Sequence, residues 1–163
     1  MTNHYKITSF FLAAFLIVAF TAFGTNAQGQ SDRVYNTITI NQLYDLMVDQ
    51  DYEVKVSETE SNTKVIIWEL NGKVAVLRLG KNSDDIIFYT IFGESSRKIT
   101  VNMVNKWNQD KRFSRSYLDT DNDPILELDL DLEGGVTQER IIKYLRTCVI
   151  SHRTWIRELQ GDS

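Results

Sequence analysis

Three aspartates, Asp119, Asp121 and Asp123, alternate along one polar segment of the chain. Alternating carboxylates open a calcium-binding loop, in which their oxygens converge on one hard cation. The rest of that motif is missing, because Pro124 stands where the loop needs glycine and Leu130 stands where it needs a bidentate glutamate. Asp and Asn are also common turn formers. We therefore predict a turn between two strands, with binding of a divalent metal as the alternative.

A thiol and an imidazole, those of Cys148 and His152, are four residues apart and would share one face of a helix. A cysteine nucleophile and its base need such proximity. Both residues fall within an apolar stripe, however, which favours a buried thiol beside a partly buried imidazole. The other histidine, His4, lies in a segment that we expect to be removed. A serine-histidine-acid triad would need His152, and zinc sites with several Cys or His ligands are excluded.

An acidic row follows the aspartate-rich segment, where Glu127, Asp129, Asp131 and Glu133 alternate with leucines. On a strand, this alternation places the leucines on one face and the carboxylates on the other. Two such carboxylates could hydrolyse a glycoside, provided that an apolar pocket raised the pKa of one of them. Nothing nearby predicts such a pocket. We expect a solvated acidic face that can dock a basic partner.

Trp107 stands beside two amides, Asn105 and Asn108, in a short helical pattern. An indole with neighbouring amides can line a ligand groove. The alternative is that Trp107 packs this helix on a sheet and the asparagines bind nearby backbone groups. We keep Trp107 and Asn108, together with the acidic row, as candidate partner-binding residues.

The N-terminal residues have the layout of a secretory signal peptide. Lys6 precedes an apolar run over residues 10–23, and Thr25-Asn26-Ala27 forms a small-residue cleavage pattern. The run is shorter than the roughly 20 residues that a membrane-spanning helix needs. We predict cleavage after Ala27 and a mature protein that is periplasmic or secreted.

Composition limits the partners of the mature chain. The whole chain has 18 basic and 22 acidic residues, and this negative balance argues against nucleic acid or an anionic membrane surface as the main partner. Without its leader the chain of 163 residues keeps 136, enough for one domain. Its single cysteine cannot form an intramolecular disulfide.

The hydrophobic periodicity predicts an antiparallel α+β fold. We expect helices near residues 40–50, 99–110 and 137–159, the last one long enough to cover a sheet. Asn71-Gly72 suits a tight hairpin turn. The expected strands are 52–57, 64–70, 73–79 and 85–92 in a meander, followed by a second hairpin of 112–118 and 125–132.

The central strands are apolar at both parities, as in Val65-Ile66-Ile67-Trp68 and Ile86-Ile87-Phe88-Tyr89. A strand with one solvated face would alternate instead. We therefore expect the helices to cover one face of the sheet. The other face would meet a partner, a second subunit or an apolar ligand.

Several motifs resemble those of the YbjN-domain family of bacterial proteins: Val104-Asn105-Lys106-Trp107-Asn108, Leu128-Asp129-Leu130-Asp131-Leu132 and Gly134-Gly135-Val136-Thr137. The resemblance covers residues 40–159. It implies an α+β fold like that of type III secretion chaperones, which are dimeric binding proteins without a catalytic site. Members are often labelled sensory transduction regulators. Many lack an export signal, so the leader of this chain is a departure from the family.

These observations predict a signal peptide at 1–27, a disordered leader at 28–38 and one YbjN-like domain at 39–160. We expect an exported, non-enzymatic protein-binding module of chaperone-like or regulatory kind. It should need no cofactor. Its partner would be another protein or, in a homodimer, a second copy of this chain. The alternative is an envelope protein that binds a small molecule or a divalent metal, or a weak hydrolase. Its pocket would lie near Trp107 and use Asp119, Asp121 or Asp123.

Overall fold

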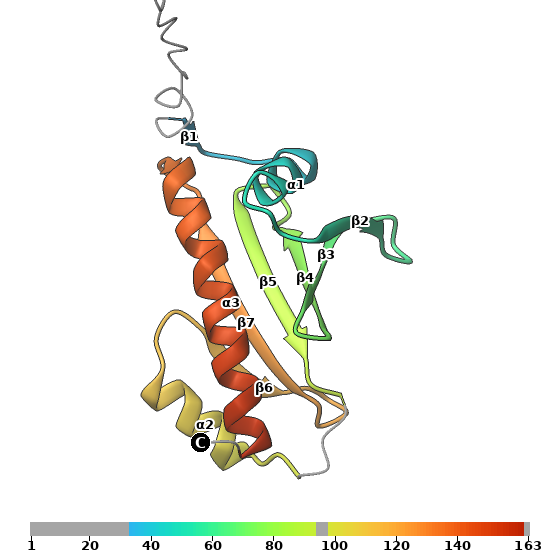
Figure 1. Cartoon of the computed structure of the whole chain (residues 1–163), viewed down its shortest axis with the longest axis vertical. Helices are drawn as coiled ribbons and strands as arrows, with labels where there is room; N and C mark the ends of the chain where they lie inside the picture. The colour runs from blue at the N-terminus through green and yellow to red at the C-terminus, as the bar shows by residue number, and fades with distance from the viewer. Residues whose placement is uncertain (1–32, 94–97, 162–163) are drawn as a thin grey trace, which may run out of the picture.

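The computed structural model describes residues 33–93 and 98–161 and shows an α+β fold with three helices and two antiparallel sheets in those ranges (Figure 1). The helices are α1 (Ile40–Val48), α2 (Val101–Asp110) and α3 (Gln138–Gln160). The strands are β1 (Val34–Tyr35), β2 (Val54–Glu58), β3 (Lys64–Leu70), β4 (Lys73–Leu79), β5 (Asp85–Ile91), β6 (Arg115–Leu118), β7 (Pro124–Asp131) and β8 (Val136–Thr137). The α+β class and the long C-terminal helix predicted from the sequence are confirmed.

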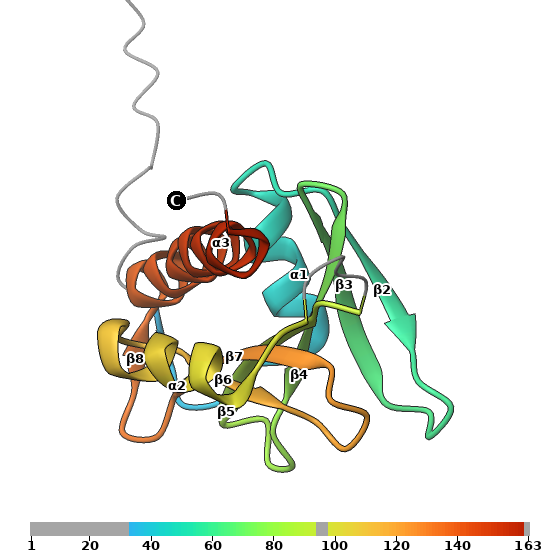
Figure 2. The ribbon, with the colours of Figure 1, turned by 90° about the horizontal axis from the view of Figure 1, so that it is seen from below.

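The main sheet has six strands in the order β2-β3-β4-β5-β7-β6, and every neighbouring pair is antiparallel. The sheet curves around α1 and α3, which lie on its concave side (Figure 2). The turn between β3 and β4 is the predicted one, since Asn71 and Gly72 both have positive φ, at 52° and 72°. The hairpin register places Ile67 opposite Val76.

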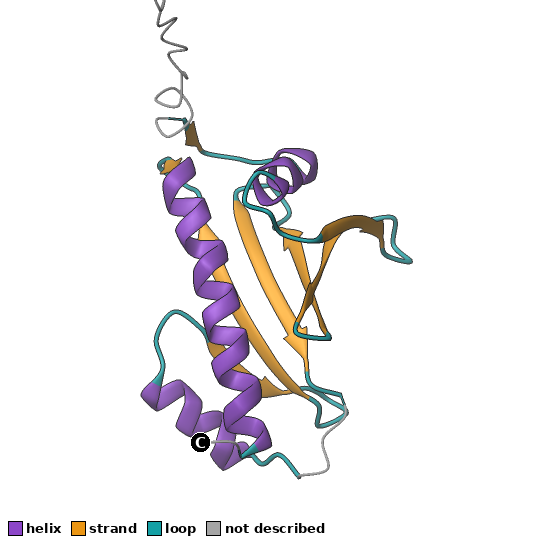
Figure 3. Cartoon of the chain, in the orientation of Figure 1, coloured by secondary structure: helices purple, strands orange, loops and turns teal. Residues whose placement is uncertain are grey.

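α3 crosses the concave side of the sheet from end to end and supplies much of the core (Figure 3). The Thr137 side chain caps its first turn by accepting from the Arg140 N–H at 3.3 Å. Gly161 ends the helix in the left-handed conformation, with φ 87°. The stripe that faces the sheet includes Leu145, Cys148 and Trp155, all fully buried. The helix therefore closes the core over β3, β5 and β7.

α1 closes the other part of the concave side. Thr39 and Gln42 form a capping box at its first turn. Leu43 and Met47, one turn apart, are fully buried against the sheet. α2 lies at the β6 edge, and its buried Trp107 joins the same core.

Part of the predicted disordered leader is ordered. In the described residues 33–38, β1 pairs with β8 and places Tyr35 opposite Val136. The Tyr35 hydroxyl donates to Gln138 Oε1 at 3.2 Å, and Ile38 is buried. Local sequence patterns do not reveal this order, because the strand pairing and the hydrogen bond are both made with residues about a hundred positions further along the chain.

The second hairpin is shorter than predicted, because β6 begins at Arg115 rather than at Arg112. Phe113 has φ 66°, a left-handed conformation that interrupts an extended strand. In the two described ranges, no helix is both long enough and apolar enough to cross a bilayer. The predicted signal peptide, residues 1–27, lies outside the described residues.

Candidate protein-binding surface

Within residues 33–93 and 98–161, no helix lies on the convex face of the main sheet (Figure 2). This face carries apolar side chains. Ile91, Ile125 and Tyr117 lie opposite one another on β5, β7 and β6 and form a row across three strands. Val74 on β4 is 56% exposed and Ile91 is 45% exposed. We call this side the outer face. Its other apolar members include Ile67, Val76, Ile87 and Tyr89, which are half-buried.

The apolar residues at alternate positions of the central strands therefore have different surroundings on the two faces of the sheet. On the inner face, Ile66, Trp68 and Phe88 are buried under the helices. On the outer face, Ile67 and Tyr89 remain half-buried. Natural sheets with one solvated face usually alternate apolar and polar residues, so an uncovered apolar face of this kind indicates an interaction surface.

An ion-pair cluster borders this apolar row. Arg115 Nη2 lies 2.7 Å from Glu127 Oε1, and the Tyr117 hydroxyl donates to Glu127 Oε2 at 2.8 Å. Arg115 Nη1 lies 3.5 Å from an oxygen of Asp129. Burial alone would raise the pKa of Glu127, but the hydrogen bonds from Arg115 and Tyr117 outweigh it and lower the pKa. Glu127 is thus a buried, paired carboxylate and not part of a solvated row.

The other acidic residues differ in their surroundings. Asp129 and Asp131 are exposed on the outer face, whereas Glu133 lies beyond the end of β7. Asp131 Oδ1 accepts from the Glu133 N–H at 2.7 Å, which shapes the end of the strand. Asp131 also lies opposite Asp85, whose pKa is raised by burial first and then by the neighbouring carboxylates. This corner of the outer face is therefore acidic and suits a basic partner group.

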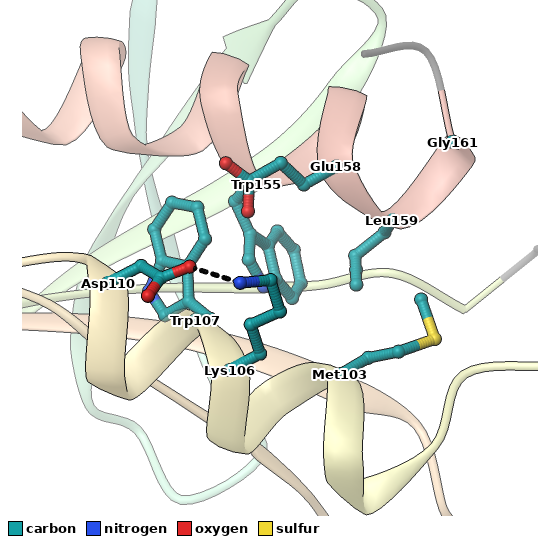
Figure 4. A pocket seen from close by; sticks show the side chains of 8 residues that line it. All are labelled: Met103, Lys106, Trp107, Asp110, Trp155, Glu158, Leu159 and Gly161. Carbon is teal, nitrogen blue, oxygen red and sulfur yellow. Dashed lines mark hydrogen bonds and ion pairs between the residues drawn. The ribbon is translucent and has the colours of Figure 1, made fainter.

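Trp107 does line a pocket, which lies between α2 and the end of α3 and has a volume of about 520 Å³ (Figure 4). Its floor is aromatic, but both indoles are engaged in the core. Trp107 Nε1 donates to Ser114 Oγ at 3.1 Å, and Trp155 Nε1 donates to Ser116 Oγ at 2.9 Å. The other lining residues are Met103, Lys106, Asp110, Glu158, Leu159 and Gly161.

The charged groups at the rim of this pocket are already paired. Lys106 Nζ lies 2.7 Å from Asp110 Oδ2, one helical turn away (Figure 4). Lys111 Nζ lies 2.6 Å from Glu158 Oε1 and so ties α2 to α3. The pocket therefore offers an apolar floor with neutralised charges around it, and its described residues supply no general acid or base aimed at a substrate.

Asn108 has a structural task that explains its place beside Trp107. Its Nδ2 donates to the Ser116 carbonyl oxygen at 2.8 Å, and its Oδ1 accepts from the Ser116 N–H at 2.8 Å. β6 is an edge strand, so this amide satisfies two backbone groups that would otherwise face outward. Both the donor and the acceptor of the Asn108 amide are thus engaged in hydrogen bonds within the protein.

Replacing Asn108 with alanine is expected to lower the free energy of unfolding by about 1 to 2 kcal/mol, because two partly buried backbone hydrogen bonds are lost. Chemical denaturation measures this change. Asn105 on the same helix is exposed, so Asn105→Ala is the control and should change the stability by less than about 0.5 kcal/mol. Equal effects of the two substitutions would contradict the assignment.

The aspartate-rich segment forms the predicted turn between β6 and β7. Asp119 Oδ1 accepts from the N–H groups of Asp121 at 3.0 Å and Asp123 at 2.8 Å, and Asn122 has φ 66°. In the part of the chain that the structure describes, no group of three His, Cys, Asp or Glu side chains could hold a metal ion. None of the three aspartates lines the pocket at Trp107.

Cys148 is buried, as the apolar stripe predicted, and His152 is fully buried rather than partly buried. Cys148 is fully buried, and burial raises the pKa of its thiol, so the thiol stays protonated and is a poor nucleophile. His152 is 1% exposed, and burial lowers its pKa to about 4. Both of its ring nitrogens are buried without a hydrogen-bond partner among the described residues. The imidazole packs edge-on against Phe88, with ring centroids 6.5 Å apart.

Sequence reasoning missed two residues of this surface, Arg115 and Tyr117. Both stand two positions apart on β6 and so point to the same side as Glu127. The pairing depends on the length of the turn between β6 and β7, which places Arg115 opposite Glu127. Aligning the two strands of this hairpin residue by residue from the sequence would have indicated that Arg115 and Tyr117 lie on the same side as Glu127.

Comparison with known proteins decides the family. A family model described as "Putative bacterial sensory transduction regulator", that of YbjN, matches residues 39–161. The chain belongs to the YbjN family. A comparison with curated proteins found no match.

Solved structures include similar folds. YbjN of E. coli is 14% identical to the chain, with a TM-score of 0.54 and coverage of 77% of this chain and 92% of that one. The type III secretion chaperone SycH of Yersinia pestis, solved in complex with a fragment of YscM2, is 13% identical. Its TM-score is 0.48, and the match covers 69% of this chain and 95% of that one. The fold of this YbjN-family chain is thus shared with YbjN of E. coli.

Proposed function

We propose that this YbjN-family protein is an exported, non-enzymatic protein-binding module of regulatory or chaperone-like kind, and that it forms a homodimer through its outer sheet face. The observation that carries the proposal is the uncovered apolar row of Ile91, Ile125 and Tyr117, with Val74 beside it. Export is supported by the signal-like residues 1–27.

A second copy suits this face because its parts complement one another. The apolar row can pack on its own copy across a two-fold axis, as isologous interfaces do. The exposed carboxylates of Asp129 and Asp131 border the face, and Arg78 supplies an exposed cation on the same side of the sheet. A homodimer can therefore bring opposite charges together around an apolar centre.

Replacing Ile91 with lysine is expected to convert the dimer into a monomer, because a charge would be buried at the centre of the interface. Light scattering on the purified protein measures the mass of the particle. Ile150 is an exposed apolar residue on α3, away from the outer face of the sheet. It gives the matched control, and Ile150→Lys should leave the dimer intact. A monomeric wild-type protein, or a dimer in both variants, would refute the proposed interface.

Partner binding by the acidic corner is tested separately. A variant with Asp129→Lys and Asp131→Lys reverses two exposed charges. It keeps Glu127 and its close partner Arg115 but removes the longer contact between Arg115 and Asp129. We expect it to fold and to lose partners that wild-type protein captures from envelope extract. Retention of the same partners would show that the acidic corner does not bind them.

The alternative function, a binder of small molecules, has a specific observation in its favour, the pocket of about 520 Å³ beside Trp107. A ligand present at 100 times its dissociation constant would stabilise the protein by about 2.7 kcal/mol. Thermal unfolding with a panel of metabolites, and with calcium for the turn at Asp119, measures this effect. A large shift with no dimer in solution would favour the alternative.

A further inference from the structure

A second cavity lies away from the outer face, between the β3–β4 turn and the last turns of α3. Its volume is about 340 Å³. Asn71 and Lys73 line it from the turn, and His152, Arg153, Ile156 and Arg157 line it from α3. The cavity is therefore built from two segments about eighty residues apart in sequence.

Three cationic residues line this cavity: Lys73, Arg153 and Arg157. No carboxylate of the described residues forms an ion pair with any of them. Lys73 makes a cation–π contact with Phe92, with Nζ 5.3 Å from the centre of the ring. The nearest acidic residue on the same helix, Glu158, is paired with Lys111 on the other side of α3. Among the described residues, the charge that lines the cavity is thus positive and not paired with a carboxylate.

The position of the arginines near the end of α3 has a structural explanation of its own, since the helix dipole favours cations there. That effect does not account for Lys73, which comes from the opposite wall. It also does not account for His152, whose two ring nitrogens are both buried without a partner in the described part of the chain. Buried polar atoms are almost always hydrogen-bonded, and an unsatisfied one destabilises the fold.

An imidazole in its neutral form can donate from one nitrogen and accept with the other. Burial lowers the pKa of His152 to about 4, so the ring is neutral at pH 7. Cys148, one turn earlier on α3, has a protonated thiol, and Phe88 faces the ring from β5. These neighbours give the ring nitrogens no hydrogen bond, and His152 is one of the residues that line the cavity.

We propose that this cavity binds a small organic anion, held through a carboxylate or phosphate group by Lys73, Arg153 and Arg157, with His152 as a hydrogen-bonding partner at its inner end. Ile156 offers an apolar wall for the carbon part of such a ligand. The size of the cavity suits a small metabolite. The site is separate from the outer face and does not depend on the protein partner proposed above.

Calorimetry with citrate and with inorganic phosphate, at pH 7 and low ionic strength, tests the proposal on the full chain. We expect at least one of the two probes to bind, and the comparison between them shows whether carboxylate or phosphate is preferred. The double variant Arg153→Gln and Arg157→Gln should weaken binding at least tenfold. Its matched control removes two charges from the first half of the same helix, Arg140→Gln and Arg146→Gln, and should bind as the wild type does.

A second readout separates the site from charge attraction in general. The anion should raise the pKa of His152, followed by NMR of its imidazole, because a nearby negative charge stabilises the protonated ring. The double variant should show no such rise. Absence of binding by both probes, equal binding by the two double variants, or an unchanged His152 resonance on saturation would each overturn the proposal.

Discussion

Replacing Tyr144 with phenylalanine is expected to lower the free energy of unfolding by about 2 to 4 kcal/mol, because one hydroxyl joins two strands inside the core. The Tyr144 hydroxyl accepts from the Phe88 N–H at 3.1 Å. It lies 3.0 Å from the Ile86 carbonyl oxygen and 2.9 Å from that of Leu128, and donates to one of them at a time. The hydroxyl is therefore part of the β5–β7 connection.

Phenylalanine keeps the buried ring of Tyr144 but removes every one of these bonds, so buried backbone groups would lose a partner in a place that water cannot reach. Denaturation by urea, analysed as a two-state transition, measures the change. Tyr44 on α1 is only half-buried and its hydroxyl has no hydrogen bond among the described residues, so Tyr44→Phe is the control. A loss below about 0.5 kcal/mol for Tyr144→Phe would show that the hydroxyl is not needed.

Acid is expected to destabilise the protein through His152 by about 3 kcal/mol between pH 6.5 and pH 4. Burial lowers the pKa of His152 in the folded protein to about 4 from an ordinary value of 6.5. The unfolded chain therefore takes up a proton across this range before the folded chain does. The stabilising contribution is complete above pH 6.5 and is lost as the pH falls toward 4.

The variant His152→Leu removes this titration and should show a flatter dependence of stability on pH in the same range. Thermal or chemical unfolding at several pH values, in chloride buffers without polyvalent anions, measures both proteins. The other histidine, His4, lies in the predicted signal peptide, and it is either kept or removed alike in both proteins, so it does not affect the comparison. Equal loss of stability in the two proteins between pH 6.5 and 4 would contradict the assignment.

Glu127 makes a second contribution to the free energy of unfolding that is lost in acid, at lower pH than that of His152. Because its folded pKa is lowered, the stability it supplies is present above the ordinary carboxyl pKa and disappears as the pH falls through the folded value. This window lies below most of the range of His152. Measurements restricted to about pH 4.5 and above therefore report mainly on the histidine.

Local patterns in the sequence determined most of the secondary structure of this protein. Asn71-Gly72 predicted the β3–β4 turn because few other dipeptides accept positive φ at two successive positions. The alternating leucines of β7 identified the inner face of the sheet, and the apolar stripe of α3 identified its buried side. Such patterns depend on neighbours within a few residues, so the chain itself carries them.

Tertiary structure alone decided which polar groups meet. The pairing of Glu127 with Arg115 and Tyr117 needed the register of a hairpin, and the Tyr144 hydroxyl reached the sheet only once α3 had docked on it. The orphaned ring of His152 and the cations around it come from α3 and a distant turn. These contacts join segments far apart in the chain, and their distances follow from packing, which no local periodicity encodes.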